Sequence, residues 1–90
     1  MHEVGLVSAA LEHALEVARR AGATHVDRLT FAIAPDGHVT REAVQTLVAV
    51  LARGTLIEGA AVEVEVAVDG LARAELTLTS IDVDVPSVSG

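Results

Sequence analysis

Residues 39–66, VTREAVQTLVAVLARGTLIEGAAVEVEV, predict a helix followed by a strand. Thr40 is a typical N-cap, Glu42 lies in the expected first turn, and Arg53 in the last turn is followed by Gly54, which can end the helix. The expected buried face of this helix recurs at steps of three and four residues: Val44, Leu47, Val48 and Leu51. Alternating apolar and polar residues at 61–66 then give the period of a half-buried strand.

The residues upstream predict a second helix and a second strand. From Val4 to Ala21, one helical face carries Val4, Val7, Leu11, Ala14, Leu15 and Ala18. Gly22 is placed to end this helix in a left-handed conformation. The stretch THVDRLTFAIA, residues 24–34, then alternates as a strand, and PDG at 35–37 predicts a turn after it.

The last third predicts a β-hairpin. A three-residue loop at 68–70, Val-Asp-Gly, would bring apolar residues together as the pairs Val66 with Ala72, Val64 with Ala74, and Val62 with Leu76. The apolar phase changes after Leu78, so a bulge is expected near Thr79 and Ser80. Pro86 should end the strand.

These elements predict an α/β (α+β) two-layer fold in the order helix, strand, helix, strand, strand. Two helices should pack on one face of a three-stranded mixed sheet. Ninety residues suffice for one domain, which we expect to span residues 1–85, with a disordered tail at 86–90.

The composition excludes several classes of function. A net charge of -7 repels phosphate backbones and anionic headgroups, so we expect no nucleic acid and no membrane as partner. No apolar run approaches the roughly 20 residues of a membrane span, and the start lacks a signal-peptide pattern, which predicts a cytoplasmic protein. The absence of cysteine excludes disulfides and thiolate metal sites, so any metal must be bound by nitrogen and oxygen.

The N-terminal residues Met1, His2 and Glu3 form a candidate metal site. His2 is too large for methionine removal, so Met1 should keep a free α-amine. That amine, the His2 amide nitrogen, the His2 imidazole and the Glu3 amide or carboxylate can close chelate rings in one plane, which suits Ni(II) or Cu(II). The alternative is a solvated helix end, with Glu3 favourable beside the helix dipole.

Other polar residues predict no chemistry. His13 with Glu16, His25, His38, and the acidic set Glu63, Glu65 and Glu75 are all expected at solvated surfaces. No serine or threonine has a histidine or lysine at a motif spacing, so we expect no enzyme and no catalytic residues.

Three stretches resemble the HypA/HybF nickel metallochaperones of hydrogenase and urease maturation: MHEVGLVSAALEHALEVARRAGATHVDRLTFAI, VTREAVQTLVAVLARGTLIEGAAVEVEV and ELTLTSIDVDV. The resemblance implies transient Ni(II) binding by Met1, His2 and Glu3. It also implies a maturation GTPase and a hydrogenase large subunit as partners. Its most specific part is ARGTLIEGA at 52–60.

The chain also departs from that family. Family members insert a zinc domain with two CxxC pairs between the last two strands, where this chain has AVDGLARA and no cysteine, so we expect no zinc. Gly5 and the turn IAPDGHV differ from the family pattern and bear on partner docking. Two alternatives therefore stay open: a metal-free interaction module that docks the same partners, and a structural domain without a ligand. An exposed edge on the last strand could also pair with a second copy as a homodimer.

Overall fold

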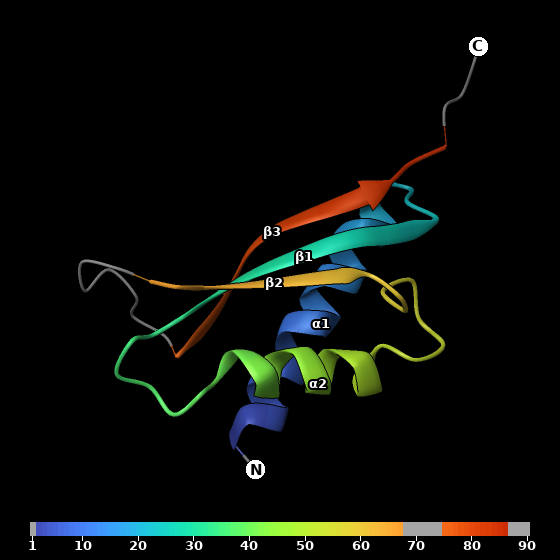
Figure 1. Ribbon diagram of the computed structural model, residues 1–90. Helices are drawn as coiled ribbons and strands as arrows, with labels where there is room; N and C mark the ends of the chain where they lie inside the picture. The colour runs from blue at the N-terminus through green and yellow to red at the C-terminus, as the bar shows by residue number, and fades with distance from the viewer. Residues whose placement is uncertain (1, 68–74, 87–90) are drawn as a thin grey trace.

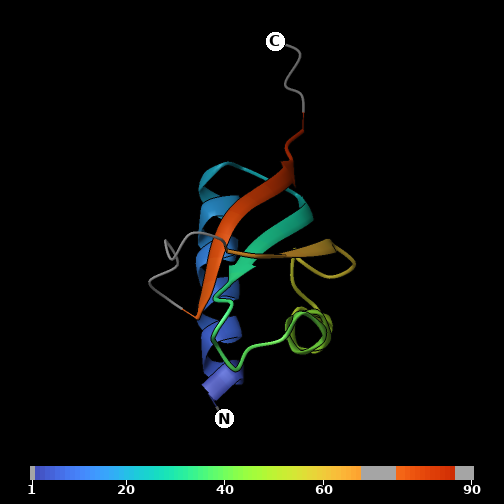
Figure 2. The same cartoon turned by 60° about the vertical axis from the view of Figure 1, so that its left-hand side comes forward.

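Strand β1, His25–Ile33, lies in the middle of a three-stranded sheet of order β2-β1-β3. The computed structural model describes residues 2–67 and 75–86, except the side chain of His2. Helices α1 (His2–Arg20) and α2 (Arg41–Leu51) cover one face of the sheet formed by β1, β2 (Ala61–Val66) and β3 (Leu76–Asp84) (Figures 1 and 2). The predicted element order and two-layer class are confirmed.

The predicted hairpin of the last two strands is wrong, because β1 lies between them. β2 runs parallel to β1 and β3 runs antiparallel to it. Val62 and Val64 were expected to pair with the last strand. Instead, they lie opposite Leu29 and Phe31 of β1. The alternation of apolar and polar residues determines which face of a strand is apolar, but not which strand lies next to it. The apolar face of β2 was therefore compatible with pairing to β1 or to β3. The predicted loop at 68–70 lies outside the described residues.

The predicted bulge in the last strand is confirmed. Ser80 lies opposite Thr30 and Leu78 lies opposite Phe31, which leaves Thr79 as the extra residue. The Thr79 hydroxyl donates a hydrogen bond to the Thr30 carbonyl at 3.1 Å. The extra residue restores the apolar phase, since four residues from both sides of the bulge contact the core: Leu76, Leu78, Ile81 and Val83.

Helix α1 begins at His2, earlier than the predicted Val4, and ends as its sequence predicts. Gly22 has φ +74° and donates to the Arg19 carbonyl, and Ala23 donates to the Ala18 carbonyl, which together form a Schellman motif. The buried face of α1 consists of Val7, Leu11, Ala14 and Ala18. The helix is therefore held against the sheet from its second turn onward.

Helix α2 begins at its predicted cap, with the Thr40 hydroxyl accepting from the Ala43 amide at 3.1 Å. Its buried face is centred on Val48, and Ala52 at the C-cap is buried in place of the predicted Leu51, which is 36% exposed. At about 100° per residue, Leu51 lies roughly 60° from Val48 around the helix, on its partly exposed flank. The helix ends at Leu51, so Arg53 follows it and is not in its last turn.

The segment between α2 and β2 forms turns that pack against the start of β1. Ile57 is 1% exposed and belongs to the core. Thr55 supports it locally, because its hydroxyl donates to the Ala52 carbonyl at 2.7 Å and accepts from the Ile57 amide at 3.1 Å. The Val26 amide also donates to the Leu56 carbonyl at 2.8 Å, which extends the contact beyond the β1–β2 ladder.

Two matched substitutions on α2 test its orientation. Val44 is fully buried and Val50 is 50% exposed, so Val44→Ala should lower the free energy of unfolding by about 2 kcal/mol, whereas Val50→Ala should change it by less than about 0.5 kcal/mol. Urea unfolding followed by circular dichroism measures both. Equal effects would show that α2 presents a different face to the sheet.

Candidate functional site

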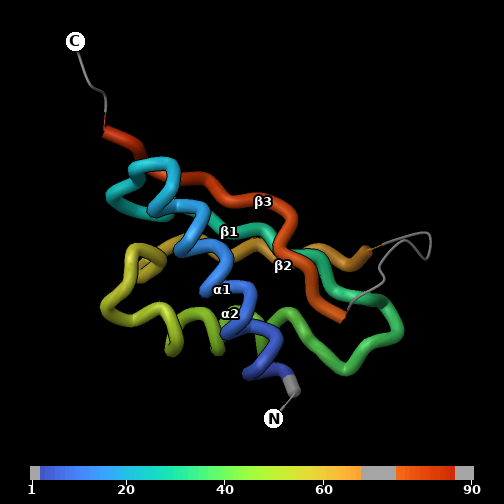
Figure 3. The backbone as a smooth tube through the Cα atoms, turned by 180° about the vertical axis from the view of Figure 1, so that it is seen from behind, coloured from blue at the N-terminus to red at the C-terminus, as the bar shows by residue number. Residues whose placement is uncertain are grey.

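The first turn of α1, which begins at His2, lies at the end of the helix that is remote from the sheet (Figures 1 and 3). The backbone N–H groups of the first helical turn have no acceptor within the helix. The His2 and Glu3 amide nitrogens are therefore not committed to helical hydrogen bonds. Met1 and the His2 side chain lie outside the description, so the predicted chelate of Met1, His2 and Glu3 stays a prediction.

The other described histidine and acidic side chains do not come together as a metal site, as their expected solvated positions imply. In residues 2–67 and 75–86, no three His, Asp or Glu side chains lie close enough to bind a metal ion. His13 and His38 are exposed, and Glu63 pairs with Arg28 at 3.8 Å. The described side chains thus form no metal-binding group of three His, Asp or Glu residues.

His25 has a structural contact that its position in the sequence did not predict. Its Nε2 lies 2.9 Å from the Glu58 carbonyl oxygen, and its Nδ1 lies 3.1 Å from Asp27 Oδ1. Both acceptors are satisfied at once only by the doubly protonated ring, so the Glu58 carbonyl first and the Asp27 carboxylate second raise the pKa of His25 above 6.5. His25 links the start of β1 to the turn before β2.

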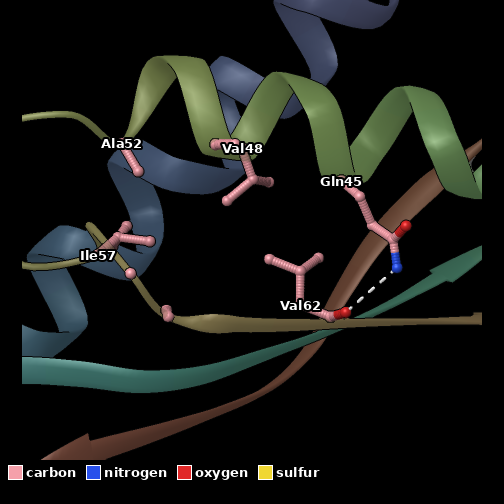
Figure 4. A pocket seen from close by; sticks show the side chains of 8 residues that line it. Gln45, Val48, Ala52, Ile57 and Val62 are labelled. Atoms are coloured by element: carbon pink, nitrogen blue, oxygen red, sulfur yellow. Dashed lines mark hydrogen bonds between the residues drawn. The ribbon is translucent and has the colours of Figure 1, made fainter.

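The outer edge of β2 is covered by two side chains of α2. Arg41 Nε donates to the Val64 carbonyl at 3.2 Å, and Gln45 Nε2 donates to the Val62 carbonyl at 3.4 Å. Beside this second bond, a pocket of about 350 Å³ lies between α2 and β2, with Val48 facing Val62 and with Ala52 facing Ile57 at the end away from Gln45 (Figure 4). Arg41 and Gln45 are spaced i, i+4, which places both side chains on the same face of the helix. This spacing is the sequence feature that could have indicated a shared contact.

A second hollow, of about 430 Å³, lies between the first turn of α1 and the first half of α2. This N-terminal groove is lined by Glu3, Val4, Glu42, Ala43, Thr46 and Leu47. The sequence gives no sign of this groove, because its two walls are separated by about forty residues and each wall has the pattern of ordinary helix surface. Glu3 belongs both to this groove and to the candidate metal site.

None of the helices within the described ranges is long and apolar enough to cross a bilayer.

Comparison with known proteins gives a family-model match, similar solved structures and one negative result. The family model described as "Hydrogenase/urease nickel incorporation, metallochaperone, hypA" matches residues 1–83. The solution structure of the Ni metallochaperone HypA from Helicobacter pylori is similar, with a TM-score of 0.77 and 12% sequence identity, over 93% of this chain and 98% of that chain. At this identity the structural likeness shows the fold. No curated protein matches the chain.

The contacts of His25 predict its titration. Its pKa should exceed 6.5, and Asp27→Asn should lower it, because the substitution removes a charged acceptor. Since the pKa is raised in the folded state, this contact adds stability below pH 6.5, and the addition is lost as pH rises through the folded pKa. NMR titration of the imidazole C–H resonances measures both proteins. A His25 pKa at or below 6.5 in the unsubstituted chain would contradict the two contacts.

Proposed function

Because this chain belongs to the HypA family of hydrogenase/urease nickel-incorporation metallochaperones, whose model matches residues 1–83, we propose that it binds Ni(II) at its N-terminus for delivery to a metalloenzyme. Family membership makes it a metallochaperone and not an enzyme. We further propose hydrogenase, or urease, as the metallocentre served, with a maturation GTPase and the hydrogenase large subunit as partners in the cytoplasm.

The observation that carries this proposal is the start of α1 at His2. Helical hydrogen bonds leave the first-turn amides free, so a metal can displace the proton of the His2 or Glu3 amide without breaking a bond of the helix. The donors in the proposed site are the Met1 amine, the His2 amide and imidazole nitrogens, and the Glu3 amide nitrogen or carboxylate. Nitrogen donors in a plane suit Ni(II), whereas Mg²⁺ and Ca²⁺ prefer oxygen.

Delivery then proceeds by ligand exchange. The proposed site lies at the end of a helix, ahead of Val7, the first fully buried residue of α1. A recipient can therefore approach the ion from solvent and replace the donors one at a time. Residues 1–85 would form the nickel-binding domain, and no zinc site is proposed, because the chain has no cysteine.

The second candidate function is a metal-free interaction module that docks the same partners. The N-terminal groove favours it, since apolar residues form part of its lining and such a surface needs no metal to bind a protein. Stoichiometric nickel binding with a square-planar absorption spectrum separates the two functions.

Selective acetylation of the N-terminus tests the nickel site. The six basic residues are all arginines, so in a protein that begins at Met1 the α-amine is the sole primary amine and an acetylating reagent modifies it alone. Acetylation and His2→Ala should each abolish the square-planar Ni(II) absorption and the one-to-one calorimetric isotherm. Both should leave the melting temperature of the metal-free protein within a degree or two, because these residues precede the core.

His13→Ala and His38→Ala are the matched controls, since both histidines are exposed and distant in sequence from the proposed chelate. Each control should bind nickel as the unsubstituted chain does. One-to-one planar binding that survives both acetylation and His2→Ala would place the nickel site elsewhere and remove the proposed mechanism.

A further inference from the structure

The N-terminal groove has both apolar and acidic side chains in its lining. Val4, Ala43 and Leu47 are each only partly buried, and they line the groove together with Glu3 and Glu42. We infer that this groove is the docking site for an amphipathic helix of a partner protein, whose apolar face packs on the apolar lining residues while its Lys or Arg side chains pair with the two carboxylates. A helix laid in a groove between two helices is a common mode of peptide recognition.

The charge of the groove selects the kind of partner. Within the part of the chain that the structure describes, neither Glu3 nor Glu42 forms an ion pair with a cationic side chain. Both carboxylates are therefore available to cations from outside, which raise the rate and specificity of association when charges are complementary. Discrimination against acidic partners follows from the same two side chains.

A second copy of this chain fits the groove poorly. A symmetric contact through this surface would bring Glu3 and Glu42 of each copy toward those of the other, in a chain of net charge -7. Like charges at short range oppose such a contact. Nucleic acid and anionic membranes are opposed by the same charge, which leaves a basic protein segment as the occupant.

The groove lies beside the proposed nickel site. Figures 1 and 3 show the N-terminal turns of α1 passing beside α2 at the side of the molecule remote from the sheet. Glu3 lines the groove and is also a donor residue of the proposed nickel site. A helix docked here would lie beside the proposed nickel site. The biological role of the docking therefore rests on the proposed function. Docking itself can be measured without nickel.

The test uses two synthetic helical peptides and the full metal-free chain. One peptide has a leucine face flanked by lysines, and the other has the same leucine face flanked by glutamates. Titration followed by ¹⁵N–¹H NMR should give saturable shifts with the lysine peptide only. The shifts should centre on the backbone amides that line the groove: Glu3, Val4, Glu42, Ala43, Thr46 and Leu47.

Ala43→Arg adds bulk and positive charge to the lining of the groove and should weaken binding of the lysine peptide at least tenfold. The matched control is Ala9→Arg, at an exposed position on α1, which makes the same change in charge away from the groove and should weaken it less than twofold. Glu42→Gln should also weaken binding, whereas Glu12→Gln on exposed α1 surface should not. Circular dichroism confirms that each variant is folded.

Three results would overturn the inference. One is equal weakening by Ala43→Arg and Ala9→Arg, which would indicate attraction to net charge alone. Another is a set of shifts centred on the pocket between α2 and β2. The third is concentration-dependent shifts of Val4 and Leu47 without peptide, which would make a second copy the occupant. Nickel calorimetry on the unsubstituted chain keeps the two proposals separate. Nickel binding without peptide docking would refute the docking inference alone, and peptide docking without nickel binding would refute the nickel site alone.

Discussion

The double pairing of β1 is the constraint on which the rest of the structure depends. The backbone groups of a central strand are buried between neighbours, so both its edges need hydrogen-bond partners. β2 and β3 supply them from opposite sides, and three inward side chains of β1 are fully buried: Val26, Leu29 and Phe31. Because β2 is parallel to β1, the chain must cross over between them, and α2 is that crossover. The positions of α2 and of both edge strands thus follow from one strand.

Local features of the fold could be predicted from the sequence because each depends on a few neighbouring residues. Thr40 as a cap, Gly22 as a left-handed terminator and the bulge at Thr79 all belong to this group. Strand pairing could not be predicted, since the face shared by Val62 and Val64 matched either neighbour. The exchange of Leu51 for Ala52 on the buried face of α2 has a similar origin, because the sequence gives the period of a helix and leaves its rotation against the sheet to tertiary packing.

The candidate site divides in the same way. Its proposed metal donors are inferred from the sequence alone, because a terminal amine, a neighbouring histidine and their amides lie together in any conformation of the chain. The N-terminal groove could not be predicted, since residue 4 and residue 47 become neighbours only when both helices pack on the sheet. The hydrogen bond between His25 and the Glu58 carbonyl could not be predicted for the same reason, because the two residues are 33 positions apart in the sequence. Chemistry carried by consecutive residues is visible in a sequence, whereas surfaces that partners recognise are products of the fold.

This difference bears on how metal binding and folding are coupled in the proposed carrier. A ligand stabilises a fold only to the extent that it binds the folded state better than the unfolded one. Structural zinc sites gather distant residues and so couple metal binding to folding. A chelate of Met1, His2 and Glu3 draws on consecutive residues that an unfolded chain also presents, and Val7 is the first fully buried position of α1. Loading and release of the ion would therefore cost the fold little, while the groove beside Glu3, which exists only in the folded chain, would decide which partner receives it.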